Sequence, residues 1–137
     1  MAEIRILRTI TEQVLGKAKQ AFEHRDLDAA TQIEPMEEVV DDLVDALRDN
    51  HLARLRAGKC TGEIGSDFLD LLSDIERISD ICSNVGVSTI MRINPSHGNV
   101  HEYISFLHSG RDEVFNRLYQ QLHDDYFSRL DALQKNA

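Results

Sequence analysis

The chain has 137 residues, of which 42% are hydrophobic and 28% charged, and this size and composition predict one globular domain over residues 1–137. Its net charge of −9, from 24 acidic and 15 basic residues, argues against nucleic-acid binding and against anionic membrane surfaces. No apolar run approaches the roughly 20 residues of a transmembrane helix. Arg5 and Arg8 interrupt the first apolar stretch, so we expect neither a signal peptide nor membrane insertion.

Apolar residues spaced three, four or seven positions apart predict the first two helices. The first is expected from about Glu3 to His24, with inward side chains at Ile4, Leu7, Val14, Ala18 and Phe22. A polar joint follows at residues 25–28, where Asp28 is a candidate cap. The second helix is expected over about Ala29–Arg56, with a start or bend near Pro35. Its inward residues are Met36, Val39, Val40, Leu43 and Leu47.

The second half of the chain predicts two further helices. Gly58 and residues 59–62 indicate a turn, and a third helix should begin at Gly65 or Ser66, capped by Ser66 or Thr61, and end near Met91. Its inward stripe is Phe68, Leu71, Leu72, Ile75, Ile78, Cys82 and Val85. Residues 94–99 read as a loop, and a fourth helix from about His101 to Leu133 has a candidate interruption at Gly110. Without strand-like alternation, the sequence predicts an all-α fold, an antiparallel up-and-down bundle of three to four long helices.

Two of these helices carry columns of oxygen-bearing side chains. The second helix has them at i, i+4 and i+8, with a further one a turn earlier: Glu37, Asp41, Asp45 and Glu34. The third helix repeats the spacing with Glu76, Asp80 and Asn84. Residues four apart differ by only about 40° around a helix, so each set forms one column. Both columns lie off the apolar stripes, and we therefore expect them outside the core, facing solvent or the shoulder of a neighbouring helix.

The density of these carboxylates favours a bound cation. Like charges four residues apart cost about 0.2–0.5 kcal/mol per pair. The second helix accumulates seven acidic residues from Glu34 to Asp49, with Arg48 as its only base before His51. Hard or borderline cations take oxygen ligands and would neutralise the repulsion. A solvated acidic face without metal is the alternative that the spacing leaves open.

Motifs for other chemistries are missing. None of the six histidines follows a glutamate by three residues, which argues against a ferritin-like di-iron enzyme. The HExxH, EF-hand, GxGxxG and Walker A patterns do not occur, so no organic cofactor is expected. Cys60 and Cys82 are too far apart for a CxxC motif and are predicted to be free thiols, Cys82 within the core.

Several segments in order resemble the PhoU family. The run Glu76-Arg77-Ile78-Ser79-Asp80, followed four residues later by Asn84 and an aliphatic residue, resembles its signature helix. Residues 34–41 are similar to the family's other carboxylate motif. The His-x-x-Arg-Leu-x-x-Gly-x-Cys turn at residues 51–60 and the His-Glu-Tyr start at 101–103 resemble most the C-terminal PhoU-like domain of bacterial sodium/phosphate cotransporter-family proteins. The resemblance spans Ile4 to Leu133.

This resemblance implies a non-catalytic regulatory domain in phosphate transport. It would be cytoplasmic, free or tethered to the inner face of the membrane within a longer transporter chain. Its partner would be a transporter membrane domain or a phosphate-signalling protein. Whole PhoU proteins carry two such bundles, so a homodimer would restore the second. A carboxylate-bridged metalloenzyme and a metal-free helical adaptor are the alternative functions.

The resemblance also implies that divalent or iron cations bind, and it implies a set of metal ligands. By matching position these are Glu37, Asp41, Glu76 and Asp80, with further candidates to complete or bridge a site at Glu34, Asp45, Asp74 and Asn84. Cys82 stands where the family commonly has a histidine.

Overall fold

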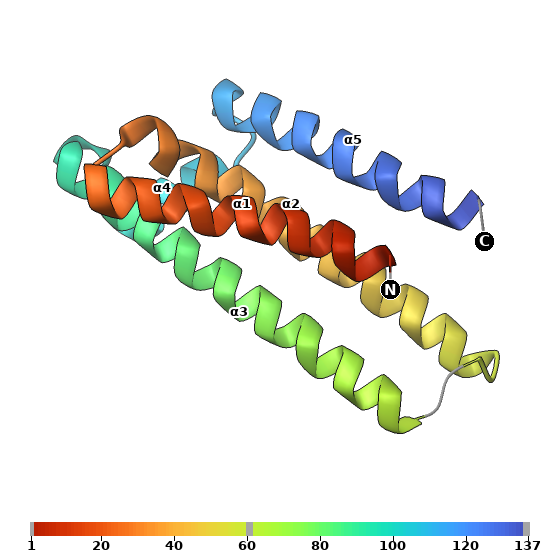
Figure 1. Ribbon diagram of the computed structural model, residues 1–137. Coiled ribbons are helices and arrows are strands. Elements are labelled where there is room, and N and C mark those ends of the chain that lie inside the picture. Colours follow the sequence, from red (N-terminus) through yellow and green to blue (C-terminus); the bar gives the residue numbers. More distant parts are fainter. Residues whose placement is uncertain (1, 60–61, 136–137) are drawn as a thin grey trace.

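The computed structural model describes residues 2–59 and 62–135, and within them all regular secondary structure is helical. The long helices are α1 (Ala2–His24), α2 (Leu27–Arg56), α3 (Gly62–Ile93) and α5 (Glu113–Lys135). A 3-10 turn (Pro95–His97) and the short helix α4 (Val100–Leu107) connect α3 to α5. Successive helices α1, α2 and α3 run antiparallel, and α5 runs in the direction of α2 (Figure 1). The predicted all-α, antiparallel, up-and-down bundle is confirmed.

One hydrophobic core holds the long helices together. Both α1 and α3 pack on α2, and α5 lies against α2 and α1. The buried side chains recur three or four residues apart, and the innermost include Leu7, Ile10, Val14, Ile33, Val40, Leu43, Leu47, Leu72 and Tyr126. Each buried aliphatic side chain contributes about 1.5–3 kcal/mol relative to exposure, so this periodic stripe accounts for the association of the helices.

Helix α2 begins slightly before the predicted position. It starts at Leu27, and its N-cap is Asp26 rather than Asp28, because the Asp26 carboxylate accepts a hydrogen bond from the backbone N–H of Ala29 at 3.0 Å. The helix continues through Pro35, which is buried within it. Packing on both sides of the helix therefore outweighs the local disruption that proline causes.

The predicted fourth helix is two helices. α4 ends at Leu107 and α5 begins at Glu113, so the interruption expected at Gly110 is present. Gly110 has a φ of 83°, a conformation that glycine adopts without strain. The Asp112 carboxylate then accepts a hydrogen bond from the Phe115 N–H at 3.0 Å and caps α5. This break allows α5 to turn and run beside α2.

Some predicted inward residues are exposed. Phe22 is 71% exposed, and Leu71 and Ile78 are 41% and 39% exposed, so their assignment to the core is wrong. Since α5 packs on α2 and α1, the face shared by α1 and α3 has no helix over it among the described residues.

Helix α3 begins at Gly62, before the predicted start; the expected cap Thr61 and the predicted free thiol Cys60 lie outside the described residues. No described helix is both long and apolar enough to cross a membrane.

Candidate metal centre

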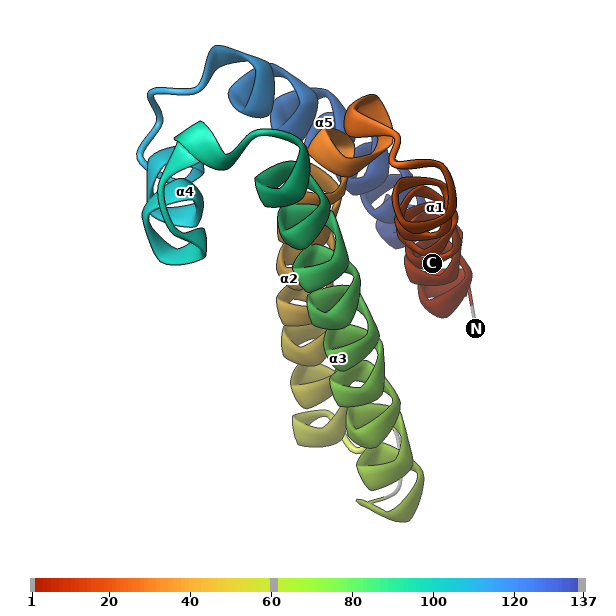
Figure 2. The ribbon, with the colours of Figure 1, turned by 90° about the vertical axis from the view of Figure 1, so that its left-hand side faces the viewer.

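The acidic face of α2 is flanked by other helices on both sides. From α3, the Ser83 hydroxyl donates a hydrogen bond to the Glu34 carboxylate. From the end of α4, His108 Nε2 lies 2.9 Å from Glu34 Oε1. Two turns further along α2, Asp42 accepts a hydrogen bond from the Tyr119 hydroxyl of α5. Figure 2 shows α3 lying against α2, with the short helix α4 to one side of them.

This arrangement buries two of the carboxylates. Glu34 is 6% exposed and Glu37 is 7% exposed, so the expectation that both columns lie outside the core is wrong for these two residues. The helical arithmetic placed them correctly on the side of α2 away from its apolar stripe. That side is nevertheless covered, because Ser83 and His108 close over it from neighbouring segments.

Three carboxylates of α2 converge on a small volume. Glu37, Glu38 and Asp41 each offer an oxygen, and these oxygens all lie within 4.8 Å of one another. Glu37 also forms side-chain hydrogen bonds with Asp41 and with Asp80 of α3. The cluster of these four residues is called the carboxylate cluster below. Among the described residues no lysine or arginine forms an ion pair with any of its members.

The pKa values reflect this lack of positive charge. Burial, followed by hydrogen bonding to Asp41 and repulsion from Asp41 and Glu34, raises the pKa of Glu37 to about 10. Burial and the charges of Asp80, Glu76 and Glu38 raise the pKa of Asp41 to about 6, against the hydrogen bond with Glu37, which lowers it. Burial also raises the pKa of Glu38, opposed by His108. At neutral pH Glu37 is therefore protonated, and its O–H group donates a hydrogen bond to Asp41.

Basic side chains lie only at the edges of the cluster. Arg48 reaches Glu76 at 3.3 Å and Asp45 at 3.4 Å. His108 Nδ1 lies 3.5 Å from Glu38 Oε2, on the opposite side. Glu76 is thus a neighbour of the carboxylate cluster and holds an ion pair of its own.

Three of the sequence-predicted ligands lie away from the cluster. The side chain of Asp45 is 74% exposed, and that of Asp74 is 66% exposed and 4.0 Å from Arg77. Asn84 is exposed and lines a separate cavity with Phe22 and Ile81. Positions eight residues apart drift by about 80° around a helix, which separates Asp45 from Glu37 and Asn84 from Glu76. The structure brings together the other five, Glu34, Glu37, Asp41, Glu76 and Asp80.

The sequence did not single out four residues at this face. Glu38 stands next to Glu37 and three residues before Asp41, so helical spacing could have found it. Ser83 belongs to the same side of α3 as Asp80. His108 and Tyr119 lie 74 and 77 residues from their partners on α2, and only the packing of α4 and α5 brings them there.

The residues present fit a hard or borderline cation. All donors in the carboxylate cluster are carboxylate oxygens, the ligands that such cations prefer. A buried glutamate that is protonated because it has no positive neighbour would release its proton to solvent when a metal ion binds. Cys82 lies in the hydrophobic core, where burial raises its pKa, and it takes no part in the donor set.

The fold and this face define a helical-bundle domain in which carboxylates of two antiparallel helices meet, with Glu34 and Glu37 of α2 buried. The model of the PhoU domain family matches residues 4–89, more than half of the chain, and the chain belongs to this family. PhoU domains are generally regulatory rather than catalytic, and membership indicates a regulatory role in phosphate homeostasis. The match covers the whole carboxylate cluster, whereas His108 and Tyr119 lie beyond it. Comparison with curated proteins and with solved structures found no match.

Proposed function

We propose that this chain is the non-catalytic, cytoplasmic regulatory domain of a sodium/phosphate cotransporter-related system, and that it binds divalent or iron cations at the carboxylate cluster. Family membership supports the link to phosphate homeostasis. The order of the motifs at residues 51–60, 76–85 and 101–103 supports the cotransporter context.

The observation that carries the metal proposal is the buried Glu37. It is 7% exposed and hydrogen-bonded to two other carboxylates, Asp41 and Asp80, and among the described residues it forms no ion pair with a lysine or arginine. Burying such a group without a counter-charge is unfavourable, as its raised pKa records. A cation would supply the missing positive charge.

The positions of the candidate ligands suggest how a bound ion would act. Glu37 and Asp41 would hold it from α2, and Asp80, with Glu76 beside it, from α3. Holding the two helices to one charge would stiffen their packing. His108 connects the same face to the end of α4. Metal binding at the cluster would therefore also affect the segment that leads into α5. The partner we propose to read this state is a transporter membrane domain or a phosphate-signalling protein, and a homodimer would provide a second bundle.

Metal analysis of the purified protein tests the assignment. Wild type should retain divalent or iron cations, and Glu37→Ala/Asp80→Ala should lose them. A matched control is Asp70→Ala/Asp131→Ala, which removes two exposed carboxylates away from the cluster and should retain the metal. Equal, negligible metal in all three proteins would refute the metal site and favour a metal-free adaptor, while the fold assignment would stand.

A further inference from the structure

A second cavity lies where the C-terminal ends of α1 and α3 meet. Its volume is about 310 Å³, and its lining residues are Ala21, Phe22, Arg25, Thr89, Arg92 and Ile93. We propose that this cavity binds a phosphoryl-type dianion through Arg25 and Arg92. The site is separate from the carboxylate cluster and goes beyond the regulatory function proposed above.

The charges around the cavity favour an anion. Among the described residues neither Arg25 nor Arg92 forms an ion pair, in a chain whose net charge is −9. Residues 81–101, which include the last three turns of α3 and Arg92, contain no aspartate or glutamate. The cavity is therefore a cationic site on an acidic molecule.

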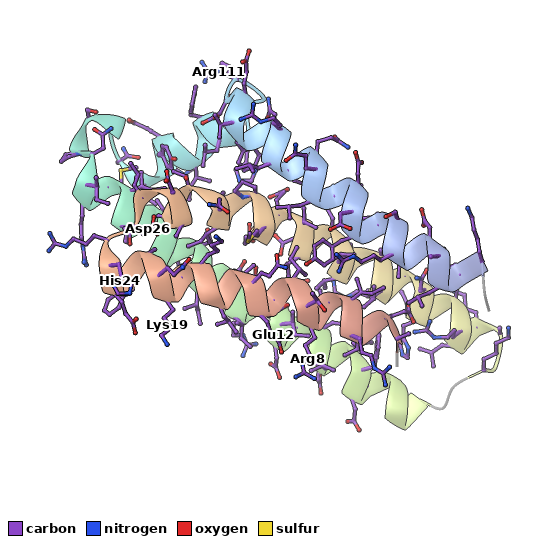
Figure 3. All side chains as sticks on the ribbon, turned by 45° about the horizontal axis from the view of Figure 1, so that its top comes forward. Arg8, Glu12, Lys19, His24, Asp26 and Arg111 are labelled. Carbon is purple, nitrogen blue, oxygen red and sulfur yellow. The ribbon has the colours of Figure 1, made fainter. Side chains whose placement is uncertain are left out.

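The acidic residues nearest to Arg25 in sequence are already engaged. Glu23 lies 3.9 Å from His24, and Asp26 caps α2 through the Ala29 N–H at 3.0 Å. His24 and Asp26, on either side of Arg25 in sequence, mark this joint at the end of α1 in Figure 3. These carboxylates have other partners and do not neutralise Arg25. The guanidinium groups of Arg25 and Arg92 can therefore bind an anion from outside the chain.

The backbone conformation of Arg25 also supports an anion site. With a φ of 49°, it is the one non-glycine residue in the left-handed region among those described. Glycine is the usual residue directly after a helix in this conformation, because a side chain there costs roughly 1–2 kcal/mol. An arginine at this joint places a positive charge at the cavity despite that cost.

The lining also constrains the ligand. Guanidinium groups present planar sets of N–H donors that match phosphate oxygens. Phe22 and Ile93 are 71% and 40% exposed at the same cavity and offer an apolar surface beside the arginines. This combination fits a phosphomonoester with an apolar or aromatic group better than inorganic phosphate alone. The same chemistry would accept the headgroup of an anionic phospholipid.

Both arginines lie at helix C-termini, where the helix dipole attracts cations. That role requires no ligand, so binding experiments separate it from the proposal. The full chain, freed of metal on a chelating resin, would be titrated with phenyl phosphate, with inorganic phosphate and with phosphatidylcholine vesicles containing phosphatidic acid. Metal-free protein keeps phosphate from binding through a cation at the carboxylate cluster.

We expect phenyl phosphate to bind saturably and more tightly than inorganic phosphate. Arg25→Gly and Arg92→Gln should each weaken binding by about tenfold or more, as expected for the loss of hydrogen bonds to a charged group. Arg117→Gln, which removes an exposed arginine of α5, should leave binding unchanged. Arg25→Gly should melt no lower than wild type, because glycine relieves the left-handed backbone, so its loss of binding would not reflect unfolding.

Binding to the vesicles alone would assign the phosphoryl group to a lipid headgroup. The proposal would be overturned if none of the three probes bound, or if binding persisted in Arg25→Gly/Arg92→Gln. Either result would leave the metal proposal untouched, since the protein is metal-free throughout.

Discussion

Glu37 combines burial with negative neighbours, and its behaviour shows why an acidic helix face need not be a solvated one. Spacing in the sequence placed Glu37 and Asp41 in one column and Asp80 in another. The structure joins the two columns at Glu37, whose carboxyl group has hydrogen-bonding partners on both helices, Asp41 of α2 and Asp80 of α3. The burial of Glu37 could not be predicted from α2 alone, because it depends on what covers the far side of that helix.

The raised pKa of Glu37 predicts how the stability of the metal-free protein depends on pH. Its pKa is 4.5 ordinarily and about 10 in the folded state, so the folded state binds this proton more tightly than the unfolded chain does. The contribution of Glu37 to the free energy of unfolding is then fully present below about pH 4.5, and it is lost as the pH rises towards 10. Asp41, with a folded pKa of about 6, adds to the decrease between its ordinary 3.8 and 6.

Glu37→Gln removes this titration while keeping the shape and a hydrogen-bond donor. At pH 8 we expect the metal-free variant to be more stable than wild type by about 1–3 kcal/mol, and the difference to vanish near pH 4. Urea unfolding from pH 4 to 9 would measure both. Parallel pH profiles for the two proteins would show that Glu37 is not held protonated in the fold.

At the scale of helices, the contact between α2 and α3 depends on a glycine. A Cβ added to Gly86 would lie 2.9 Å from Ile33 Cδ1 and 3.2 Å from the Ala30 carbonyl oxygen. The close approach of the two helices at this point keeps Ser83, one turn earlier, against Glu34.

Gly86→Ala should therefore destabilise the protein, even though alanine favours helix. Overpacking costs about 1–3 kcal/mol and the helical gain is about 1 kcal/mol, so we expect a net loss of about 1 kcal/mol. Gly16→Ala in α1 is the matched control: nothing lies within 4 Å of its added Cβ, and it should stabilise by about 0.5–1 kcal/mol. Chemical denaturation of both variants gives the comparison, and equal stabilisation would contradict a tight α2–α3 contact.

The helices differ in how far the sequence predicts them. The apolar periods of α1, α2 and α3 are long and regular, and these helices were predicted to within a few residues. The division of the last segment depends on Gly110, which suggested a break without fixing its length, and on the Asp112 cap, which the structure revealed. The place of α5 beside α2 rests on long-range packing, for which the sequence held no local signal. For this reason His108 and Tyr119 could not be assigned to the acidic face beforehand.

Over the whole molecule, charge is distributed unevenly. The carboxylate cluster lies between α2 and α3, and the cavity with Arg25 and Arg92 lies at the C-terminal ends of α1 and α3. A net charge of −9 gives no hint of this cationic end, because it averages over the two regions. The composition correctly indicated a globular helical chain, but the two candidate sites emerge only from which helix ends and faces meet.

The central claim is that a cation completes the carboxylate cluster, and metal-linked thermal unfolding tests it most directly. Manganese(II) would be titrated into metal-free wild type and into Glu37→Ala/Asp80→Ala at pH 7, with the melting temperature measured by calorimetry. A ligand at 100 times its Kd stabilises the folded state by about 2.7 kcal/mol, which for a chain of this size raises the melting temperature by roughly 10 °C. We predict a saturable rise of this order in wild type and none in the variant. Equal shifts in both proteins, or no shift in either, would contradict a metal site between α2 and α3.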